Sequence, residues 1–212
     1  MRLSTICESF DNLDTQSDRF FGRKNANKGI DFNKVLKAFG LRPFKGSPKI
    51  IGEGSTATVY VNPYNYHQVI KVTGDGNDAS NFNKLLKKGF QHPSVAHCYN
   101  VRRIGPQAYA ILLDRVEGQV FAYGSMLTDL IQGDNFEEPA EAANSILKGP
   151  LNNIRQKVLD EVGIQDSHRE RKKLAVLFDG MAKLEAFGIY IFDVGENVID
   201  TGDYYVLIDI GQ

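Results

Sequence analysis

Three polar side chains near the end of the chain have the residue types and the spacing that phosphoryl transfer requires. Asp193 and Asn197 lie in the run GIYIFDVGENVI, and Asp209 follows the apolar run VLI. One Asp can orient an attacking hydroxyl and accept its proton, whereas an Asn and a second Asp can hold the Mg²⁺ ions that bridge nucleotide phosphates. We therefore take Asp193 as a candidate catalytic residue and Asn197 and Asp209 as candidate metal ligands.

A Gly-rich run and a lysine further upstream could hold the phosphates themselves. Gly52 and Gly54 lie in the run IIGEGSTATVY, and glycines let backbone N–H groups approach phosphate oxygens closely. Val59 has the place that a valine takes after such a loop, although a plain hairpin turn explains the run about as well. Lys71, in the strand-like run VIKV, would point its ammonium into the same cleft; the alternative is a surface lysine with its stem on apolar neighbours.

The apolar pattern around these residues predicts an antiparallel sheet. Short runs rich in β-branched residues and bounded by turn signals predict five strands, at 49–54, 58–61, 68–73, 96–104 and 107–115. A helix is predicted over 78–88, between the third and fourth strands. The expected order is therefore β-β-β-α-β-β, with the Gly-rich run in the first hairpin and Lys71 on the third strand.

Helical patterns flank this sheet. Four apolar residues before Gly40 recur at helical spacing, which predicts a helical extension over 1–46. After a linker at 116–118, helices are predicted over 121–131, 140–148, 151–162 and 169–187. We expect an α+β fold with three parts: the extension (1–46), a lobe with the five-stranded sheet (47–118) and a reduced helical lobe (119–212) that ends in the hairpin with Asp193 and Asp209.

Composition excludes several classes of protein. The chain has 212 residues, of which 42% are hydrophobic, so it can bury a core and is not disordered. A formal net charge of −1 argues against direct nucleic-acid binding as the main activity. No apolar run approaches the about 18 residues that cross a bilayer. Cys7 and Cys98 lack metal or redox spacing and fit a reducing cytoplasm.

Taken together, five segments resemble the protein-kinase family in order and relative position. They are IGEGSTATVY, VIK, AILLDRVEG, GIYIFDVGENVI and VLIDIG, and the resemblance covers about residues 49–118 and 170–211. It implies a minimal, two-lobed kinase-like fold and an ATP- and Mg²⁺-dependent phosphotransferase. More narrowly, the chain is similar to the early Ser/Thr protein kinases of T7-like phages. That similarity implies transfer to host proteins, such as the transcription machinery, in the host cytoplasm.

The resemblance also implies roles for individual residues. Lys71 would contact the α- and β-phosphates, and Gly52 and Gly54 would line the phosphates, with Val59 beside them. The backbone of Asp114 and Val116 would bind adenine, with Leu112 near the back of the adenine pocket. Asp193 would be the catalytic Asp, and Asn197 and Asp209 would bind Mg²⁺.

The sequence departs from the family in several places. The segment from Asp193 to Asn197 is one residue shorter than the family's catalytic loop, and Ile191 and Phe192 replace its His and Arg. No Glu lies where the helix after Lys71 should offer one, and we assign the nearest acid, Asp78, to the helix N-cap. Lys71 is thus predicted to be unpaired and activity to be low or conditional. The segments that normally seat a peptide substrate do not follow Asp209.

Two other functions are compatible with these departures. A pseudokinase would bind and modulate a host partner without transferring phosphate. A small-molecule phosphotransferase of the aminoglycoside or choline kinase type would also work without a peptide-seating segment. Among the remaining features, we interpret His92-Pro93 and 200–203 as turns, and the basic run 168–173 as a solvated surface.

Overall fold

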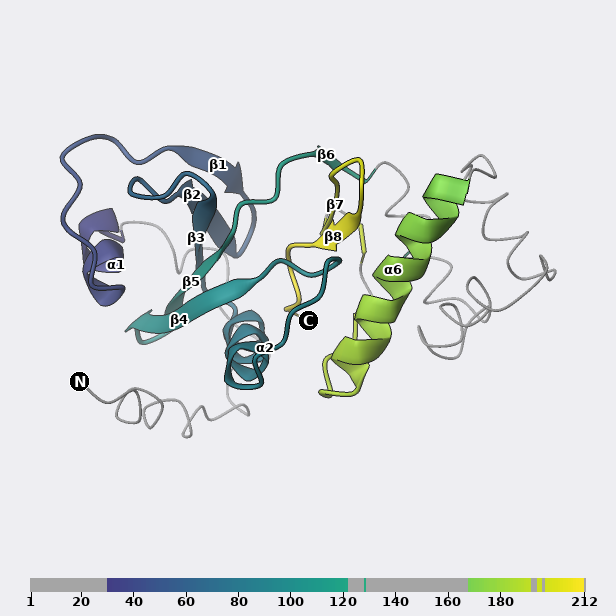
Figure 1. Ribbon diagram of the computed structural model, residues 1–212. Helices are drawn as coiled ribbons and strands as arrows, with labels where there is room; N and C mark the ends of the chain where they lie inside the picture. Colours follow the sequence, from purple (N-terminus) through teal and green to yellow (C-terminus); the bar gives the residue numbers. More distant parts are fainter. Residues whose placement is uncertain (1–29, 122–127, 129–167, 192–193, 196, 212) are drawn as a thin grey trace.

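The computed structural model describes residues 30–121, 128, 168–191, 194–195 and 197–211 (Figure 1). Apart from Phe121 and Thr128, the predicted helices over 121–131, 140–148 and 151–162 lie outside these ranges, as do Asp193, Cys7 and most of the extension. No helix in the described ranges combines the length and apolar character needed to cross a membrane.

Five antiparallel strands and one helix form the first lobe, as predicted. The strands are β1 (Ile50–Glu53), β2 (Ala57–Val61), β3 (Gln68–Thr73), β4 (Cys98–Gly105) and β5 (Ala108–Asp114), and helix α2 (Gly76–Lys87) connects β3 to β4. Their order in the sheet is β1-β2-β3-β5-β4. The predicted α+β architecture, with an antiparallel five-stranded sheet and one helix in the first lobe, is confirmed by the number, direction and sequence order of these elements.

The two faces of the sheet bury two different apolar clusters. Successive side chains of a strand point to opposite faces, so β3 contributes Val69 to one cluster and Ile70 and Val72 to the other. The first cluster continues through α2 into the second lobe. The second is covered by helix α1 (Phe32–Ala38), whose Val35 and Leu36 are fully buried; of the predicted extension the structure describes residues 30–46.

The second lobe contains helix α6 (His168–Glu185) and a small sheet of β6 (Gln119–Val120), β7 (Val198–Asp200) and β8 (Tyr205–Leu207). The apolar stripe of α6 is buried, with Leu174, Phe178 and Met181 among its fully covered residues. Gly188 follows the helix with a φ of 67°, a conformation in which glycine is favoured. The hairpin β7–β8 lies between α6 and the first lobe and carries Asn197 before it and Asp209 after it (Figure 1).

Candidate active site

A cavity of about 420 Å³ lies where the first sheet meets the linker and the β7–β8 hairpin. Eight described residues predicted for the site line it, although they come from segments far apart in the sequence. They are Gly52, Gly54, Val59, Lys71, Asp114, Val116, Asn197 and Asp209. The structure therefore brings the predicted set together, with Asp193 outside the described residues.

The inner wall of this cavity is apolar. Val59, Val69 and Leu113 line it from the sheet, and Ile199 and Ile208 line it from the hairpin. Apolar surfaces on two sides suit a flat ring system. The prediction that placed Leu112 at the back of the pocket is wrong, because Leu112 packs with the cluster on the opposite face of the sheet.

The ammonium of Lys71 lies between two carboxylates. Its Nζ is 2.8 Å from Oδ2 of Asp78 and 2.7 Å from Oδ2 of Asp209. The side chains of Lys71 and Asp78 are 6% and 1% exposed, whereas that of Asp209 is 32% exposed. Lys71 thus links strand β3, helix α2 and the residue that follows the hairpin, and its open side faces the cavity.

Burial and charge act in opposite directions on these groups. Burial alone would lower the pKa of Lys71, but Asp78 and Asp209 outweigh it and raise this pKa above its ordinary value. Lys71 is therefore a cation at neutral pH. Burial raises the pKa of Asp78, and the charge of Lys71 opposes this rise only in part. Oδ1 of Asp78 is buried and has no hydrogen-bond partner in the described part of the chain, so this carboxylate depends on Lys71.

The partner of Lys71 was missed by the sequence analysis. Helix α2 begins at Gly76, and its N-cap is Asp75, whose side chain accepts a hydrogen bond from the backbone N–H of Asn77. Asp78 therefore lies inside the first turn and points back to β3. The prediction that Asp78 is the N-cap and the prediction that Lys71 is unpaired are both wrong. The shorter Asp replaces the expected Glu because it lies near the start of α2.

Helix α2 is held in this position by the segment after β8. The side-chain amide of Asn81 donates a hydrogen bond of 2.7 Å to the carbonyl of Ile210. A Cβ at Gly211 would lie 2.5 Å from the Cβ of Asp78, so only glycine fits there without displacement of one of them. The backbone N–H of Gly211 donates to Oδ1 of Asp209. The same segment thus orients Asp209 and positions Asp78.

The Gly-rich turn leaves room beside its glycines. The backbone N–H of Gly54 donates to the carbonyl of Ala57 over 2.8 Å and closes the β1–β2 turn. A Cβ at Gly52 or Gly54 would find its nearest protein atoms at 3.7 and 3.9 Å, and neither residue has a positive φ. The protein itself therefore does not require glycine at either position, whereas a closely approaching ligand would.

Val116 of the linker offers a backbone N–H and a carbonyl to the cavity. The N–H groups of Asp114 and Arg115 donate to the carbonyls of His97 and His67. The backbone N–H and carbonyl of Val116 have no hydrogen-bond partner within the described ranges, and Val116 lines the cavity. Val116 is thus better placed than Asp114 to hydrogen-bond the edge of a ring.

Two further side chains position the loop and hairpin that carry the predicted site residues. Oγ1 of Thr128 accepts hydrogen bonds from the backbone N–H groups of Val194 (2.9 Å) and Gly195 (3.1 Å), between Asp193 and Asn197. Nζ of Lys173 donates to both carboxylate oxygens of Asp200, at 3.0 and 3.1 Å. Lys173 is buried, so the prediction of a solvated surface over 168–173 is wrong at this residue.

The donors at the cavity fit a magnesium ion. Mg²⁺ is usually held by one or two protein oxygens together with substrate phosphates and water, rather than by a complete protein cage. Asn197 and Asp209 supply an amide and a carboxylate at the same cavity. No group of three or more His, Cys, Asp or Glu within the described ranges could hold a metal ion. A metal held by Asn197 and Asp209 would complete its coordination with water and substrate phosphates.

Comparison with known proteins gives only distant similarities. No protein-family model matches the sequence, and no curated protein matches it. The PK-1 kinase of Cydia pomonella granulovirus has 14% identity and a TM-score of 0.44, over 85% of this chain and 57% of its own. The apo form of a thermostable mutant of aminoglycoside phosphotransferase APH(4)-Ia has 11% identity and a TM-score of 0.36; the match covers 83% of this chain and 69% of the phosphotransferase. Likeness of this degree does not fix the chemistry of a site, which depends on the side chains within it.

Proposed function

We propose that this protein is an ATP- and Mg²⁺-dependent phosphotransferase. The observation that carries the proposal is the position of Lys71, whose buried ammonium lies between Asp78 and Asp209 at one side of the cavity. A cation held between strand β3 and helix α2 is oriented rather than free. The ammonium can contact two phosphates while its own position stays fixed. Catalysis of phosphoryl transfer rests largely on positioning, so it requires such a fixed cation.

Each part of the cavity has a role in this proposal. The apolar wall and the backbone of Val116 receive the adenine, and the Gly-rich turn and Lys71 receive the phosphates. Asn197 and Asp209 hold Mg²⁺, which neutralises charge on the phosphates when it is bound. Asp193 orients the acceptor hydroxyl; this role rests on the sequence resemblance alone.

We further propose Ser and Thr side chains of host proteins as acceptors, in the host cytoplasm. Support comes from the resemblance to early phage Ser/Thr kinases. The paired Lys71 removes one of the reasons for preferring a pseudokinase, because Asp78 supplies the acidic partner that the sequence analysis found missing. A small-molecule acceptor stays an alternative, and the experiment below separates it from a protein acceptor.

The decisive measurement is thermal stability with ATP and Mg²⁺, for the wild type and Asp209→Asn, followed by transfer from γ-labelled ATP. At a ligand concentration one hundred times Kd, binding to the native state adds about 2.7 kcal/mol to the free energy of unfolding. We expect a Mg²⁺-dependent rise that Asp209→Asn abolishes, and label on protein rather than on an aminoglycoside or choline. No rise in the wild type at saturating ATP would contradict the proposal.

A further inference from the structure

One end of the first lobe is basic although the whole chain is nearly neutral. Residues 30–121 contain 12 Lys and Arg and six Asp and Glu, a net charge of +6, whereas the whole chain carries −1. Five of the basic residues lie on α1 and the segment that follows it: Lys34, Lys37, Arg42, Lys45 and Lys49. All five are exposed. We call them the basic surface.

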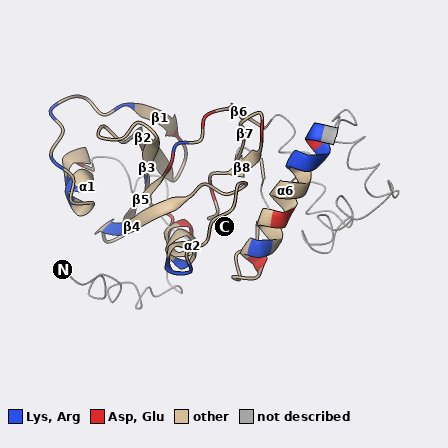
Figure 2. Cartoon of the chain, viewed as in Figure 1, with Lys and Arg blue, Asp and Glu red and all other residues tan. Residues whose placement is uncertain are grey.

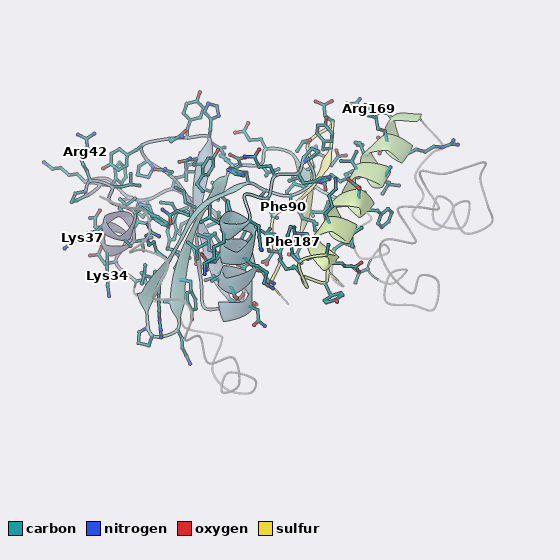
Figure 3. All side chains as sticks on the ribbon, turned by 60° about the horizontal axis from the view of Figure 1, so that its bottom comes forward. Lys34, Lys37, Arg42, Phe90, Arg169 and Phe187 are labelled. Carbon is teal, nitrogen blue, oxygen red and sulfur yellow. The ribbon has the colours of Figure 1, made fainter. Side chains whose placement is uncertain are left out.

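The basic surface lies on one side of the molecule. Lys34 and Lys37 are one helical turn apart on α1, and Figure 3 shows them with Arg42 around this helix, away from α6. In Figure 2 the basic segments of α1, of the following segment and of the end of β4 gather at the same end of the molecule. Arg102 and Arg103 supply the charge on β4.

Local contacts hold this surface in shape. The side chain of Asn33 pairs with the backbone of Phe44, accepting from its N–H at 2.7 Å and donating to its carbonyl at 3.3 Å. The hydroxyl of Tyr64 donates to the carbonyls of Arg42 and Pro43, and the guanidinium of Arg42 lies 5.5 Å from the centroid of the Tyr64 ring. The segment after α1 is thus fixed to the helix and to the β2–β3 turn, so its charges are displayed from a rigid support.

Among the residues that the structure describes, no acidic side chain neutralises these charges. None of the five side chains forms an ion pair in the part of the chain that the structure describes, and Asp31, the one acidic residue of 30–49, accepts from the N–H of Asn33 as the N-cap of α1. Exposed basic residues elsewhere do form such pairs: Arg169 with Asp203 and Lys183 with Asp179. An unmatched cluster on a rigid support attracts an acidic partner and steers its approach.

We propose that the basic surface docks an acidic peptide segment of a partner protein. A nucleic acid is the weaker match, because residues 122–212 contain eight basic and 16 acidic residues, a net charge of −8. A long polyanion gains no further attraction from a chain whose net charge is −1, whereas a short acidic segment can bind the basic surface alone. The surface lies on the face of the sheet opposite the cavity, so docking does not depend on phosphotransfer.

Fluorescence anisotropy tests this proposal with a short labelled peptide of alternating Asp and Ser, compared with a neutral Gly–Ser peptide and a single-stranded oligonucleotide. The test variant is Lys34→Glu/Lys37→Glu. The matched control is Lys88→Glu/Lys172→Glu, which reverses two other exposed charges and changes the net charge equally. We expect salt-sensitive binding of the acidic peptide, weakened roughly ten-fold or more in the test variant and less than about two-fold in the control.

Three results would overturn the proposal. An equal loss of affinity for the acidic peptide in both double variants would mean that only the net charge of the protein matters. Tighter binding of the oligonucleotide than of the acidic peptide would assign the surface to nucleic acid. Self-association in sedimentation, abolished by Lys34→Glu/Lys37→Glu, would assign it to a second copy of this chain. Thermal unfolding of each variant shows that the fold survives the substitutions.

Discussion

The ammonium of Lys71 lies 2.8 Å from a carboxylate oxygen of Asp78 that is almost fully buried. Removal of one partner of such a pair leaves the other charge buried and costs about 3–5 kcal/mol. We therefore expect Lys71→Met to destabilise the protein strongly, and Lys71→Met/Asp78→Asn to recover most of that loss. Both variants should lack phosphotransfer. Urea unfolding measures the stability of both variants, and transfer from γ-labelled ATP measures their phosphotransfer activity.

This double variant separates two roles of Lys71. If Lys71 only neutralised Asp78, the double variant would regain activity together with stability. If Lys71 contacts phosphates, stability alone returns. Transfer activity in Lys71→Met/Asp78→Asn comparable to that of the wild type would contradict the role proposed for Lys71.

The Gly-rich turn gives a second test, because the protein has room for a Cβ at both glycines. We expect Gly52→Ala and Gly54→Ala to change the free energy of unfolding by no more than about 1 kcal/mol. Affinity for ATP should fall roughly ten-fold or more if backbone N–H groups approach the phosphates. Calorimetric titration with ATP checks this, with Ser55→Ala as the control in the same turn. Unchanged affinity in both glycine variants would mean that the turn is structural.

Thr128 positions the segment between Asp193 and Asn197 through two hydrogen bonds. Thr128→Val keeps the shape but leaves two backbone N–H groups without their acceptor, whereas Thr128→Ser keeps the hydroxyl. We expect Thr128→Val to lower kcat roughly ten-fold with little change in ATP affinity. We expect Thr128→Ser to keep kcat close to that of the wild type. A loss in ATP affinity as large as the loss in kcat would argue against a positioning role.

His92 predicts a pH dependence of stability. Its ring nitrogens lie 2.8 Å from Oγ of Ser94 and 2.9 Å from Oδ2 of Asp179, and burial lowers its pKa below the ordinary 6.5. Just below pH 6.5 the imidazole of His92 therefore binds a proton in the unfolded chain more readily than in the folded protein. Stability should fall as the pH drops from 6.5 through the folded pKa, with a slope of at most about 1.4 kcal/mol per pH unit.

The substitution His92→Gln should flatten this part of the stability profile, measured by urea unfolding at a series of pH values. His67→Gln is the control, because His67 is exposed. Hydrogen bonding to Lys183 lowers the pKa of Asp179, and the stability this confers is lost only in a more acidic range, below its ordinary 3.8. An unchanged profile in His92→Gln would assign the slope to other groups.

Gly211 gives a prediction about the position of helix α2. A Cβ there would overlap Asp78 and lie 2.9 Å from Oδ2 of Asp75. We expect Gly211→Ala to push the start of α2 away from β3, lowering thermal stability and ATP affinity together. Slower hydrogen exchange or unchanged exchange in α2 of Gly211→Ala would contradict this displacement. Gly76→Ala controls for the general cost of replacing glycine, because Gly76 also starts α2, has no positive φ, and a Cβ there would make only ordinary contacts of 3.7 Å or more.

The sequence was most informative where periodicity decided the structure. The five strands and α6 follow directly from apolar spacing, and the order of the motifs placed eight site residues at one cavity. Single-residue decisions were less reliable. Asp78 was misassigned because the helix begins two residues earlier than predicted, which moves an acid from the cap into the first turn.

Other errors have equally local causes. Leu112 and Leu113 differ by one position in a strand, and only register decides which of them faces the cavity. Lys173 lies in a run of charged residues that suggests a solvated face, but its ammonium is held by Asp200, which is 27 residues away in sequence. Contacts of that kind cannot be inferred from spacing. Only the tertiary arrangement reveals them.

Strand β3 faces the cavity with Val69 and Lys71 and faces α1 with Ile70 and Val72. Its pairing with β2 is fixed by the turn before it, where Asn62 is bonded through backbone and side chain to Gln68. Surface turns usually tolerate insertions and deletions. Here one added or missing residue would send the ammonium of Lys71 into the apolar layer beneath α1 and an aliphatic side chain into the cavity. The length of this remote turn is therefore under the same constraint as the site itself.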